Sequence, residues 1–302
     1  MGLNLSGMTT ETRNPRTMQL DQMSPLEIVT VMNEEDARVP LAIAKCLPQI
    51  AQAVTWAAES FEKGGRLFYM GAGTSGRLGV LDAAECPPTF GVPKEMVVGL
   101  IAGGEKAFIE AVEGAEDSRE LAVEDLKAHG LTANDLVVGI AASGRTPYVL
   151  GGLDYAKSVG CHTAAIACNI GSAIGKAAEL AIEVNCGPEV LTGSTRLKSG
   201  TAQKLILNMI STGSMVRTGK AYQNLMVDVQ QTNEKLHTRA ENIVIDATGV
   251  ERENARAAID AAGGSVKTAI TMLLADCDAA EAARRLERAR GHVREAIRLE
   301  VL

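Results

Sequence analysis

The sequence predicts an α/β protein: a doubly wound, mostly parallel five-stranded sheet with N-terminal helices and a small C-terminal helical bundle. Three observations predict this fold. Between residues 66 and 220, short apolar runs alternate with segments of helical periodicity. Two of the runs end in loops of small and hydroxyl-bearing residues, the arrangement expected at the carboxyl ends of parallel strands. After Gly219 the composition changes, and from Ala240 the chain is dense in Ala, Glu and Arg.

Length and composition restrict the class of protein. A chain of 302 residues allows one large or two modest domains, and we expect boundaries that separate residues 1–56, 57–220 and 221–302. The net charge of −7, without a dense Lys/Arg cluster, argues against a nucleic-acid partner. No apolar run reaches the length of a membrane span and the N-terminus lacks a signal-peptide core, so we expect a cytoplasmic protein without a membrane partner.

The cysteines and histidines indicate neither disulfides nor metal. The six cysteines are scattered without a C-x-x-C pair, which is typical of small buried side chains in a reducing compartment. The four histidines show no metal-ligand spacing, so we expect no metal site.

The N-terminal region precedes the first strand. Residues 1–20 are polar and carry Asn14-Pro15, so we expect an extended or partly ordered arm. Ser24-Pro25-Leu26-Glu27 combines an N-cap, a proline at the first helical position and a capping-box glutamate, and predicts a helix running towards Glu35. A second helix is expected from Leu41 to Phe61, ended by the glycines of Lys63-Gly64-Gly65.

The central stretch of the chain is Arg66–Thr89. An apolar strand, Leu67–Met70, breaks into Gly71-Ala72-Gly73-Thr74-Ser75-Gly76, and a helix is expected from Arg77 until Pro87-Pro88 end it. Such a turn lets amides and hydroxyls at a helix N-terminus approach an anion. The loop also matches G-x-G-x-x-G, but it lacks the later acidic residue of a dinucleotide fold and the Lys-Ser/Thr of a Walker A motif. A glycine-rich turn without a ligand stays open as an alternative.

The remaining strands and helices alternate. Further strands are expected at 96–101, 135–140, 162–167 and 180–184, and helices at 106–112, 119–129, 148–158 and 202–217. The third strand runs into a second loop of small and hydroxyl-bearing residues, Ala141–Pro147, and Gly193–Thr201 is a similar segment before the last helix. Asp117 with Glu120 has the form of a capping box, which would place Glu116 just outside a helix N-terminus.

The region after Gly219 is expected to be helical. Ala221–Lys235 is amphipathic, with apolar side chains between Leu225 and Val229. This segment and helix 202–217 carry more apolar surface than a lone five-stranded sheet covers, so we expect a homodimer that buries it. Breaks that indicate a bundle of about three short helices lie at Thr248-Gly249, Gly263-Gly264 and Asp276–Asp278.

Taken together, these segments resemble the N-acetylmuramic acid 6-phosphate etherases, a family of the sugar isomerase (SIS) superfamily with a flavodoxin-like sheet. The resemblance covers nearly the whole chain and rests on Gly71–Arg77, Asp82–Thr89, Glu113–Arg119, Ala141–Pro147, Gly193–Thr201 and Asn233–His237. It implies a cofactor-free homodimeric lyase acting on a small-molecule sugar phosphate. Such an enzyme cleaves the D-lactyl ether of N-acetylmuramic acid 6-phosphate to N-acetylglucosamine 6-phosphate and D-lactate, by elimination then hydration, in the recycling of cell-wall amino sugars.

The resemblance also implies roles for individual residues. Glu85 and Glu116 match the family's acid/base pair. In related isomerases a histidine of the partner subunit opens the sugar ring, and His237 is the candidate for this role here. Lys198 is a second candidate for it. The C-terminal bundle resembles the family's small ubiquitin-associated-like module. Residues that match the sugar-phosphate-binding loops are Gly73, Thr74, Ser75, Ser143, Gly144 and Thr146.

The expected positions of the two glutamates assign them different roles. Glu116 precedes a helix N-terminus, whose positive end favours the ionised carboxylate and suits a base. Glu85 is expected at a helix C-terminus, whose negative end disfavours ionisation and suits an acid.

Two other functions stay open on the residues alone. An aldose–ketose isomerase on the same fold moves one proton between adjacent carbons, whereas an etherase must also assist a leaving group, which favours two carboxylates. A regulatory sugar-phosphate sensor shares the first loop, but it has no evident use for Glu85 and Glu116.

Simpler roles are also open for the other site residues. Ser143 and Thr146 could cap the helix that follows them. His237 is either the ring-opening group or a cation at a helix C-terminus. Arg77 and Arg145 are either carboxylate clamps or surface residues.

Overall fold

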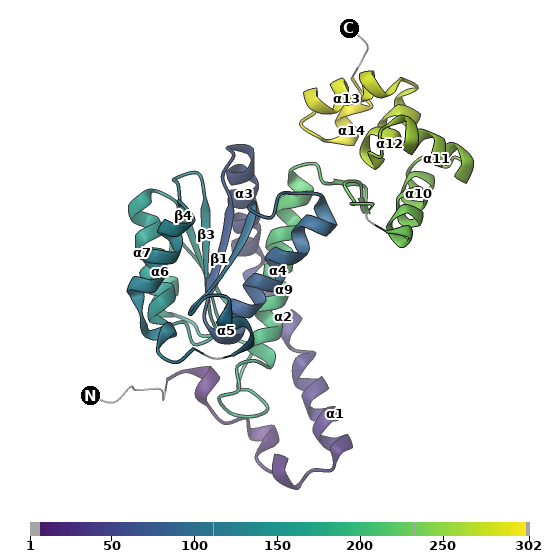
Figure 1. Ribbon diagram of the computed structural model, residues 1–302. Helices are drawn as coiled ribbons and strands as arrows, with labels where there is room; N and C mark the ends of the chain where they lie inside the picture. Colours follow the sequence, from purple (N-terminus) through teal and green to yellow (C-terminus); the bar gives the residue numbers. More distant parts are fainter. Residues whose placement is uncertain (1–6, 111, 232, 300–302) are drawn as a thin grey trace. The chain divides into compact units, whose positions relative to one another are not determined.

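The computed structural model describes residues 7–110, 112–231 and 233–299, and the chain forms two compact units (Figure 1). The first unit comprises Met1–Ala84 and Glu95–Ser211, and the second comprises Glu85–Lys94 and Thr212–Leu302. Each unit has its own apolar core, and each is described by itself.

The first unit is built on a five-stranded sheet. All four strand pairings are parallel, and the order is β2-β1-β3-β4-β5, as in a flavodoxin-like doubly wound fold. The predicted fold class is therefore confirmed, as are the positions of all five strands. These are β1 (Leu67–Gly71), β2 (Val97–Ile101), β3 (Leu136–Ala141), β4 (His162–Ala167) and β5 (Leu180–Glu183).

Helices cover both faces of this sheet, which explains why β1 and β3 are buried throughout (Figure 1). On one face lie α3 (Leu47–Glu62), α4 (Gly73–Phe90) and α9 (Lys198–Arg217), and on the other lie α6 (Arg119–Ala128) and α7 (Pro147–Val159). Alternate side chains of β1 point to opposite faces. Tyr69 contacts Gly79 of α4, and Met70 contacts Gly152 of α7, so both helices approach the sheet closely through a glycine.

The prediction for α4 was wrong at both ends. The helix begins at Gly73, four residues earlier than expected, and it continues through Pro87 and Pro88 to Phe90. Both prolines lie in the last turn, and the amide of Gly91 still donates to the carbonyl of Pro87 (2.9 Å). A proline fixes φ near the helical value, so a helix that ends within one turn loses only the few bonds that the prolines cannot donate.

Other helix boundaries also differ from the predictions. The predicted helix over 41–61 is divided into α2 (Val39–Ile43), a 3-10 turn (Ala44–Cys46) and α3, because Pro48 starts a new helix in its first turn. The capping box at Asp117 was wrong, since Ser118 caps α6 by accepting from the amide of Leu121 (3.2 Å). The remaining helices of this unit are α1 (Pro25–Asp36), with the predicted capping box, α5 (Lys106–Ile109) and α8 (Ala173–Ala177).

The N-terminal arm, defined here as residues 8–23, was predicted to be extended or partly ordered, and it is not extended. It forms three 3-10 turns, Thr9–Glu11, Pro15–Thr17 and Leu20–Gln22. Asn14 caps the second turn by accepting from the amide of Arg16, and the following proline occupies the first helical position. The Asn-Pro pair was therefore a turn signal within the arm. Residues 1–6 lie outside the described part of the chain.

The second unit departs from prediction at its start. Instead of a helix over 221–235, a short hairpin pairs β6 (Ala221–Tyr222) with β7 (Leu225–Met226). Gln223 in its turn has a positive φ of 55°, which interrupts any helix there. Val227 and Val229 of the predicted dimer contact are buried in the core of this unit, whereas Met209 and Val216 of the predicted helix over 202–217 are 38% and 45% exposed.

Five helices follow in the described part of the second unit, where about three were expected. The three predicted breaks are confirmed, and a fourth lies at Arg290-Gly291, where both residues have positive φ. The helices are α10 (Glu234–Thr248), α11 (Arg252–Ala261), α12 (Val266–Ala275), α13 (Ala279–Arg288) and α14 (Val293–Ala296).

Candidate active site

The loop between β3 and α7 presents two hydroxyls at a helix N-terminus, neither of which donates to another described residue. Thr146 is the N-cap of α7, but its side chain makes no capping hydrogen bond. The Ser143 Oγ accepts a hydrogen bond from the amide of Arg145 (3.3 Å), which leaves its proton free to donate. Of the two interpretations open for these residues, simple helix capping by Thr146 does not occur. The loop can therefore offer two O–H donors to an anion.

Gly144 makes the tight turn of this loop possible. Its φ is +72°, and a Cβ at this position would lie 2.4 Å from the Cβ of Ser172. Any larger residue would meet both backbone strain and a steric overlap.

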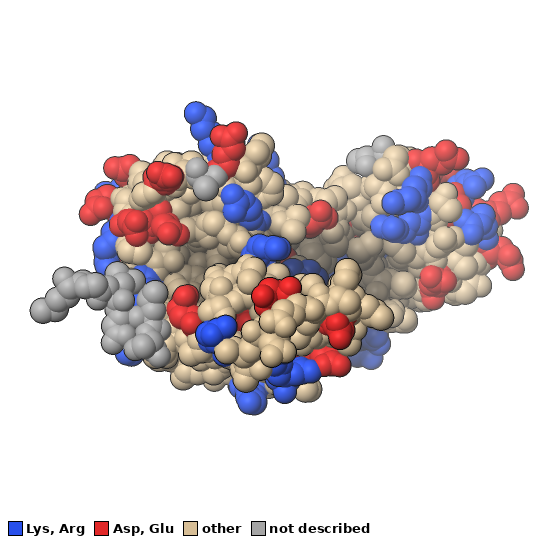
Figure 2. All heavy atoms as spheres, turned by 90° about the horizontal axis from the view of Figure 1, so that it is seen from below, with Lys and Arg blue, Asp and Glu red and all other residues tan. Residues whose placement is uncertain are grey.

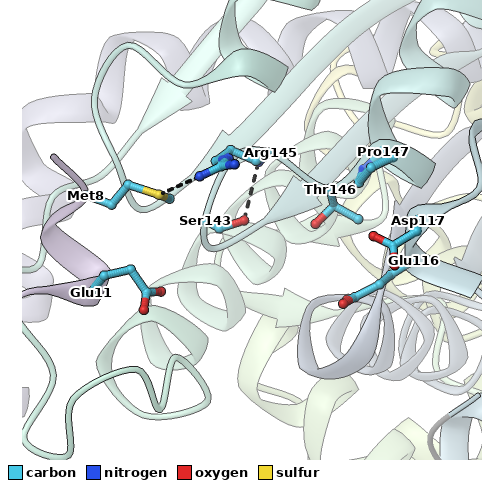
Figure 3. Close-up of a pocket in the computed structure, with 8 residues that line it drawn as sticks. All are labelled: Met8, Glu11, Glu116, Asp117, Ser143, Arg145, Thr146 and Pro147. Atoms are coloured by element: carbon cyan, nitrogen blue, oxygen red, sulfur yellow. Dashed lines mark hydrogen bonds between the residues drawn. The ribbon is translucent and has the colours of Figure 1, made fainter. Parts of the chain in front are cut away.

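A hollow of about 260 Å³ opens in front of this loop, and we call it the Ser143 pocket (Figure 3). In Figure 3, Glu11 and Glu116 lie on opposite sides of the pocket, with Ser143 and Arg145 between them. The pocket therefore combines hydroxyl donors, a guanidinium and carboxylates. Its lining residues are Met8, Glu11, Glu116, Asp117, Ser143, Arg145, Thr146 and Pro147.

Arg145 is the cation of the Ser143 pocket. The only polar contact of its side chain within the described part of the chain is a 3.4 Å approach of Nη1 to the Sδ of Met8 (Figure 3). The guanidinium has no carboxylate partner among the described residues, although Glu11, Glu116 and Asp117 line the same pocket. An unpaired, half-buried guanidinium favours the binding of an anion.

The loop between β1 and α4 differs in what its hydroxyl does. Ser75 is buried in the first turn of α4, and its Oγ donates to the Oε1 of Gln203 on α9 (3.0 Å). The Nε2 of Gln203 is also buried and has no hydrogen-bond partner among the described residues. Thr74 is half-buried beside the start of α9, where its methyl group would lie 3.6 Å from a Cβ at Gly200.

A second hollow, of about 340 Å³, lies beside the β1–α4 loop, and we call it the Gly73 pocket. Gly73 lines it with a positive φ of 52°, but neither Thr74 nor Ser75 does. Arg77 lines it too, yet its guanidinium donates to the carbonyls of Phe108 (2.7 Å) and Ala107 (2.8 Å). Arg77 therefore holds α5 in place, whereas Arg145 stays available.

Glu116 connects the two pockets. It lies in the 3-10 turn Ala115–Asp117, just before α6, as predicted from the sequence. Its side chain is exposed, and it lines both the Ser143 pocket and the Gly73 pocket. Of the predicted site residues, the structure brings Gly73, Glu116, Ser143 and Thr146 to these two hollows.

Glu85 lies on α4 and belongs to the second compact unit, so the pockets of the first unit are described without it. Its side chain is exposed. The prediction that it terminates a helix was wrong, because α4 continues five residues further, to Phe90. The negative end of α4 is formed by its last carbonyls, so the local reason for an acid at Glu85 does not hold.

His237 also lies in the second unit. It is in the first turn of α10, whose N-cap is Asn233, so its interpretation as a cation at a helix C-terminus was wrong. Its Nδ1 is 3.0 Å from the Oε1 of Gln231, and it lines a hollow of about 460 Å³ together with Gln230 and Asp228. Residue 232, beside this contact, lies outside the described part of the chain.

In the third hydroxyl-bearing segment, Gly193–Thr201, donors are already hydrogen-bonded to a carboxylate of the protein itself. The carboxylate of Glu189 accepts from the amides of Lys198 (3.0 Å) and Ser199 (2.9 Å) and from the Ser199 hydroxyl (2.8 Å). The Nζ of Lys198 donates to Glu35 of α1 (2.6 Å), and both side chains are 1% exposed. Lys198 is therefore a buried ion-pair partner and not a group facing either pocket.

The charge of Glu35 is held by several donors. Burial alone would raise the pKa of this carboxyl, but hydrogen bonds from Lys198 and Arg16 outweigh it and lower the pKa below its ordinary value of 4.5. Asn14 also donates to Glu35 (3.0 Å). This network ties the N-terminal arm to α1 and to the start of α9.

Sequence reasoning missed the contribution of the arm to the Ser143 pocket. Met8 and Glu11 line the pocket, and Asn169 fastens the arm to the β3–α7 loop through Thr10. The partners Thr10 and Asn169 are 159 residues apart, so no local pattern connects them. The one available signal was the polar Thr-Glu pair within an arm that begins with hydrophobic Met8.

On the face of the molecule that Figure 2 shows, acidic and basic side chains are interspersed. Among the described residues, no three His, Cys, Asp or Glu side chains are arranged to hold a metal ion. No helix in the described part of the chain is long and apolar enough to cross a membrane.

Comparisons with known families identify the central domain. The sequence profile described as "SIS domain" matches residues 120–212. The profile described as "Glucokinase regulatory protein N-terminal SIS domain" matches residues 49–157.

Individual relatives agree over a much larger part of the chain. An N-acetylmuramic acid 6-phosphate etherase from Exiguobacterium is 63% identical over 97% of this chain and 100% of its own length. Another from Serratia proteamaculans is 61% identical over 98% of this chain and 99% of its own. The structure of a phosphoheptose isomerase from Francisella tularensis aligns with a TM-score of 0.50 and 18% identity, covering 64% of this chain and 100% of that one. That likeness concerns the fold alone.

Proposed function

The chain belongs to the family of N-acetylmuramic acid 6-phosphate etherases, and from that premise we propose which of its residues carry the reaction. The reaction cleaves the D-lactyl ether of N-acetylmuramic acid 6-phosphate, releasing N-acetylglucosamine 6-phosphate and D-lactate in amino-sugar recycling. One observation carries the proposal: the exposed carboxylate of Glu116 lines both pockets at the ends of β1 and β3.

The chemistry needs a base and an acid. Opening of the sugar ring places an aldehyde at C1, which makes the proton on C2 acidic. A base removes that proton. The electron pair of the C2–H bond then forms the C2–C3 double bond, and the C3–O bond breaks. The lactate oxygen takes a proton from an acid, and water then adds at C3 to give the hydroxyl of the product.

We assign the base to Glu116. Its turn lies just before the N-terminus of α6, whose positive end stabilises a carboxylate. It shares a pocket with the hydroxyls of Ser143 and Thr146 and with the guanidinium of Arg145, which has no carboxylate partner among the described residues. Glu85 is proposed as the acid from the family resemblance alone. His237 is kept as a proposed ring-opening group on the same ground.

The phosphate is proposed to bind at the β3–α7 loop. A phosphate dianion needs several donors, and this loop offers the Ser143 and Thr146 hydroxyls together with the N-terminus of α7. Arg145 supplies positive charge beside them. The β1–α4 loop contributes Gly73 to the neighbouring pocket, and direct contacts from Thr74 and Ser75 remain predictions.

The roles of the two glutamates can be separated by isotope exchange. Glu116→Gln should lose lactate release by about 10²- to 10⁴-fold, together with exchange of the C2 proton for solvent deuterium. Glu85→Gln should also stop lactate release, yet keep the C2 exchange because the base remains. Lactate is measured enzymatically and exchange by NMR. Glu120→Gln is the matched control, since this neighbouring exposed acid lines neither pocket.

The opposite pattern of exchange would reverse the two roles. Normal lactate release by either variant would end the assignment of that residue. Interconversion of sugar phosphates without lactate would favour the isomerase, and binding without any turnover would favour the sensor.

We also propose that the enzyme is a cytoplasmic homodimer. Exposed apolar side chains support a dimer. Those of α1 and α2 include Leu26, Val29 and Leu41, which are 74%, 57% and 70% exposed, and those of the predicted helix α9 include Met209, which is 38% exposed. Six free cysteines, five of them buried, favour a reducing compartment. Sedimentation at micromolar concentration is expected to give twice the mass of the chain, and Leu26→Glu with Leu41→Glu should shift it to the monomer. A monomeric wild-type protein would refute the dimer.

A further inference from the structure

The N-terminal arm is fastened to the β3–α7 loop by one buried amide. The side chain of Asn169 accepts from the amide of Thr10 (3.3 Å) and donates to its hydroxyl (3.0 Å). The same Nδ2 approaches the carbonyls of Ala142 and Ser143, each at 3.3 Å. Thr10 and Asn169 are 1% and 6% exposed. One side chain thus holds the arm and the proposed phosphate loop in a common position.

The other end of the arm is anchored independently. Asn14 donates to Glu35 (3.0 Å) and to the carbonyl of Pro188 (3.2 Å), and the Thr17 hydroxyl donates to the carbonyl of Val190 (2.8 Å). Buried contacts therefore lie on both sides of Glu11, which sits at the end of the first 3-10 turn. Its backbone is held although its side chain is only half-buried.

The carboxylate of Glu11 faces the Ser143 pocket without a partner of its own. It has no hydrogen bond or ion pair with any described residue, and Figure 3 shows it across the pocket from Glu116. A Cβ at Gly193 would lie 3.8 Å from its Oε2, so the start of the third segment flanks it. A carboxylate only accepts hydrogen bonds, and it repels a phosphate. The groups of a sugar phosphate that suit it are its neutral O–H and N–H donors.

We propose that Glu11 is a substrate-binding residue, whose carboxylate accepts a hydrogen bond from an O–H or N–H group of the sugar. This inference rests on the proposed function and extends it, because it makes the N-terminal arm one wall of the substrate site. The pocket then has two halves. The β3–α7 loop binds the phosphate, and Glu11 binds the sugar.

Binding measurements with two probes test this division without requiring turnover. Isothermal titration with N-acetylglucosamine 6-phosphate should show a loss of affinity of about 10- to 100-fold in Glu11→Ala, the range expected for one hydrogen bond to a charged group. The affinity for inorganic phosphate should stay unchanged or rise slightly, because a negative charge is removed. Glu11→Gln, which keeps an acceptor oxygen, should lose less. Ser143→Ala should weaken both probes.

The matched control is Asp21→Asn, an exposed acid of the same arm that does not line the Ser143 pocket. It should bind both probes as the wild type does. Unchanged sugar-phosphate affinity in Glu11→Ala would overturn the proposal. Equal losses for both probes would also overturn it, since they would indicate a displaced arm and not a lost contact. Failure of the wild type to release lactate would instead refute the proposed function. The binding comparison would still test the role of Glu11, because it does not require turnover.

Discussion

The β3–α7 loop and the start of α9 are similar in sequence and opposite in structure. Both place hydroxyls and a glycine before a helix N-terminus. In the first, Ser143 and Thr146 line a hollow, and among the described residues no carboxylate is hydrogen-bonded to their hydroxyls. In the second, Glu189 accepts from two amides and a hydroxyl, so the helix end is already occupied by an anion. The β1–α4 loop lies between these cases, because its Ser75 is bonded to the neutral Gln203.

The difference shows that a helix N-terminus becomes a ligand site only when the fold leaves it empty. Donors at a helix end bind whichever acceptor reaches them, whether it belongs to the substrate or to the protein. Glu189 is 0% exposed and reaches α9 from nine residues away in sequence. No equivalent acid reaches α7 among the described residues, where Glu11 and Glu116 face the pocket from across it.

The largest expected effect is on stability, and it concerns the buried ion pair between Glu35 and Lys198 at the start of α9. Glu35→Gln leaves the charge of the buried Lys198 unpaired and should lower the free energy of unfolding by about 3–5 kcal/mol at pH 7. Because the pKa of Glu35 is lowered in the folded protein, its contribution is fully present above 4.5 and is lost as the pH falls through the lower folded value. Denaturant titrations should show the two proteins converging below about pH 4.5.

Glu34→Gln provides the control for this prediction. Glu34 neighbours Glu35 on α1 and pairs with Arg16 at the surface, where an ion pair contributes at most about 1 kcal/mol. A difference between wild type and Glu35→Gln that is independent of pH would contradict the assigned role of the charge.

An intermediate effect on stability is expected when alanine replaces Gly144 of the β3–α7 loop or Gly73 of the β1–α4 loop. Gly144→Ala combines a left-handed backbone with the overlap against Ser172 and should cost about 2–4 kcal/mol, with loss of phosphate binding. Gly73→Ala also has a positive φ but no atom within 4 Å of the new Cβ, so it should cost only the backbone strain of about 1–2 kcal/mol. Thermal unfolding and lactate release measure both. Equal costs would show that the two turns are constrained alike.

The smallest expected effect distinguishes the hydroxyl of Ser143 from that of Ser75. Ser143→Ala should raise KM by about 10- to 100-fold with unchanged stability, because it removes a donor to a charged ligand. Ser75→Ala strands the Oε1 of the buried Gln203 and should lower stability by about 1–3 kcal/mol. A large rise in KM for Ser75→Ala, without loss of stability, would place the phosphate at the β1–α4 loop instead. That outcome would make the two loops equivalent, as their sequences suggest.

The sequence by itself determined the sheet, its strands and several helix starts, because these depend on local patterns. Apolar runs of four to six residues such as Leu67–Met70 bury themselves wherever they form strands. The capping box at Ser24 and the turn position of Glu116 also follow from neighbours within three or four residues. Local patterns also explain the wrong predictions, which concern the end of α4 at Pro87, the cap at Asp117 and the structure of residues 221–235. At each of them tertiary packing or a nearby competing cap outweighed a weak local preference.

Only the tertiary structure decided which polar groups were left free. Lys198 is paired with Glu35 across 163 residues, Ser75 with Gln203 across 128, and Thr10 with Asn169 across 159. A hydrogen bond between side chains so distant leaves no periodicity or spacing in the sequence. The site consists of the donors and carboxylates that such contacts did not use. The sequence left Arg77 and Arg145 equivalent as candidates, and the structure separated them; Glu11 became visible only in the structure.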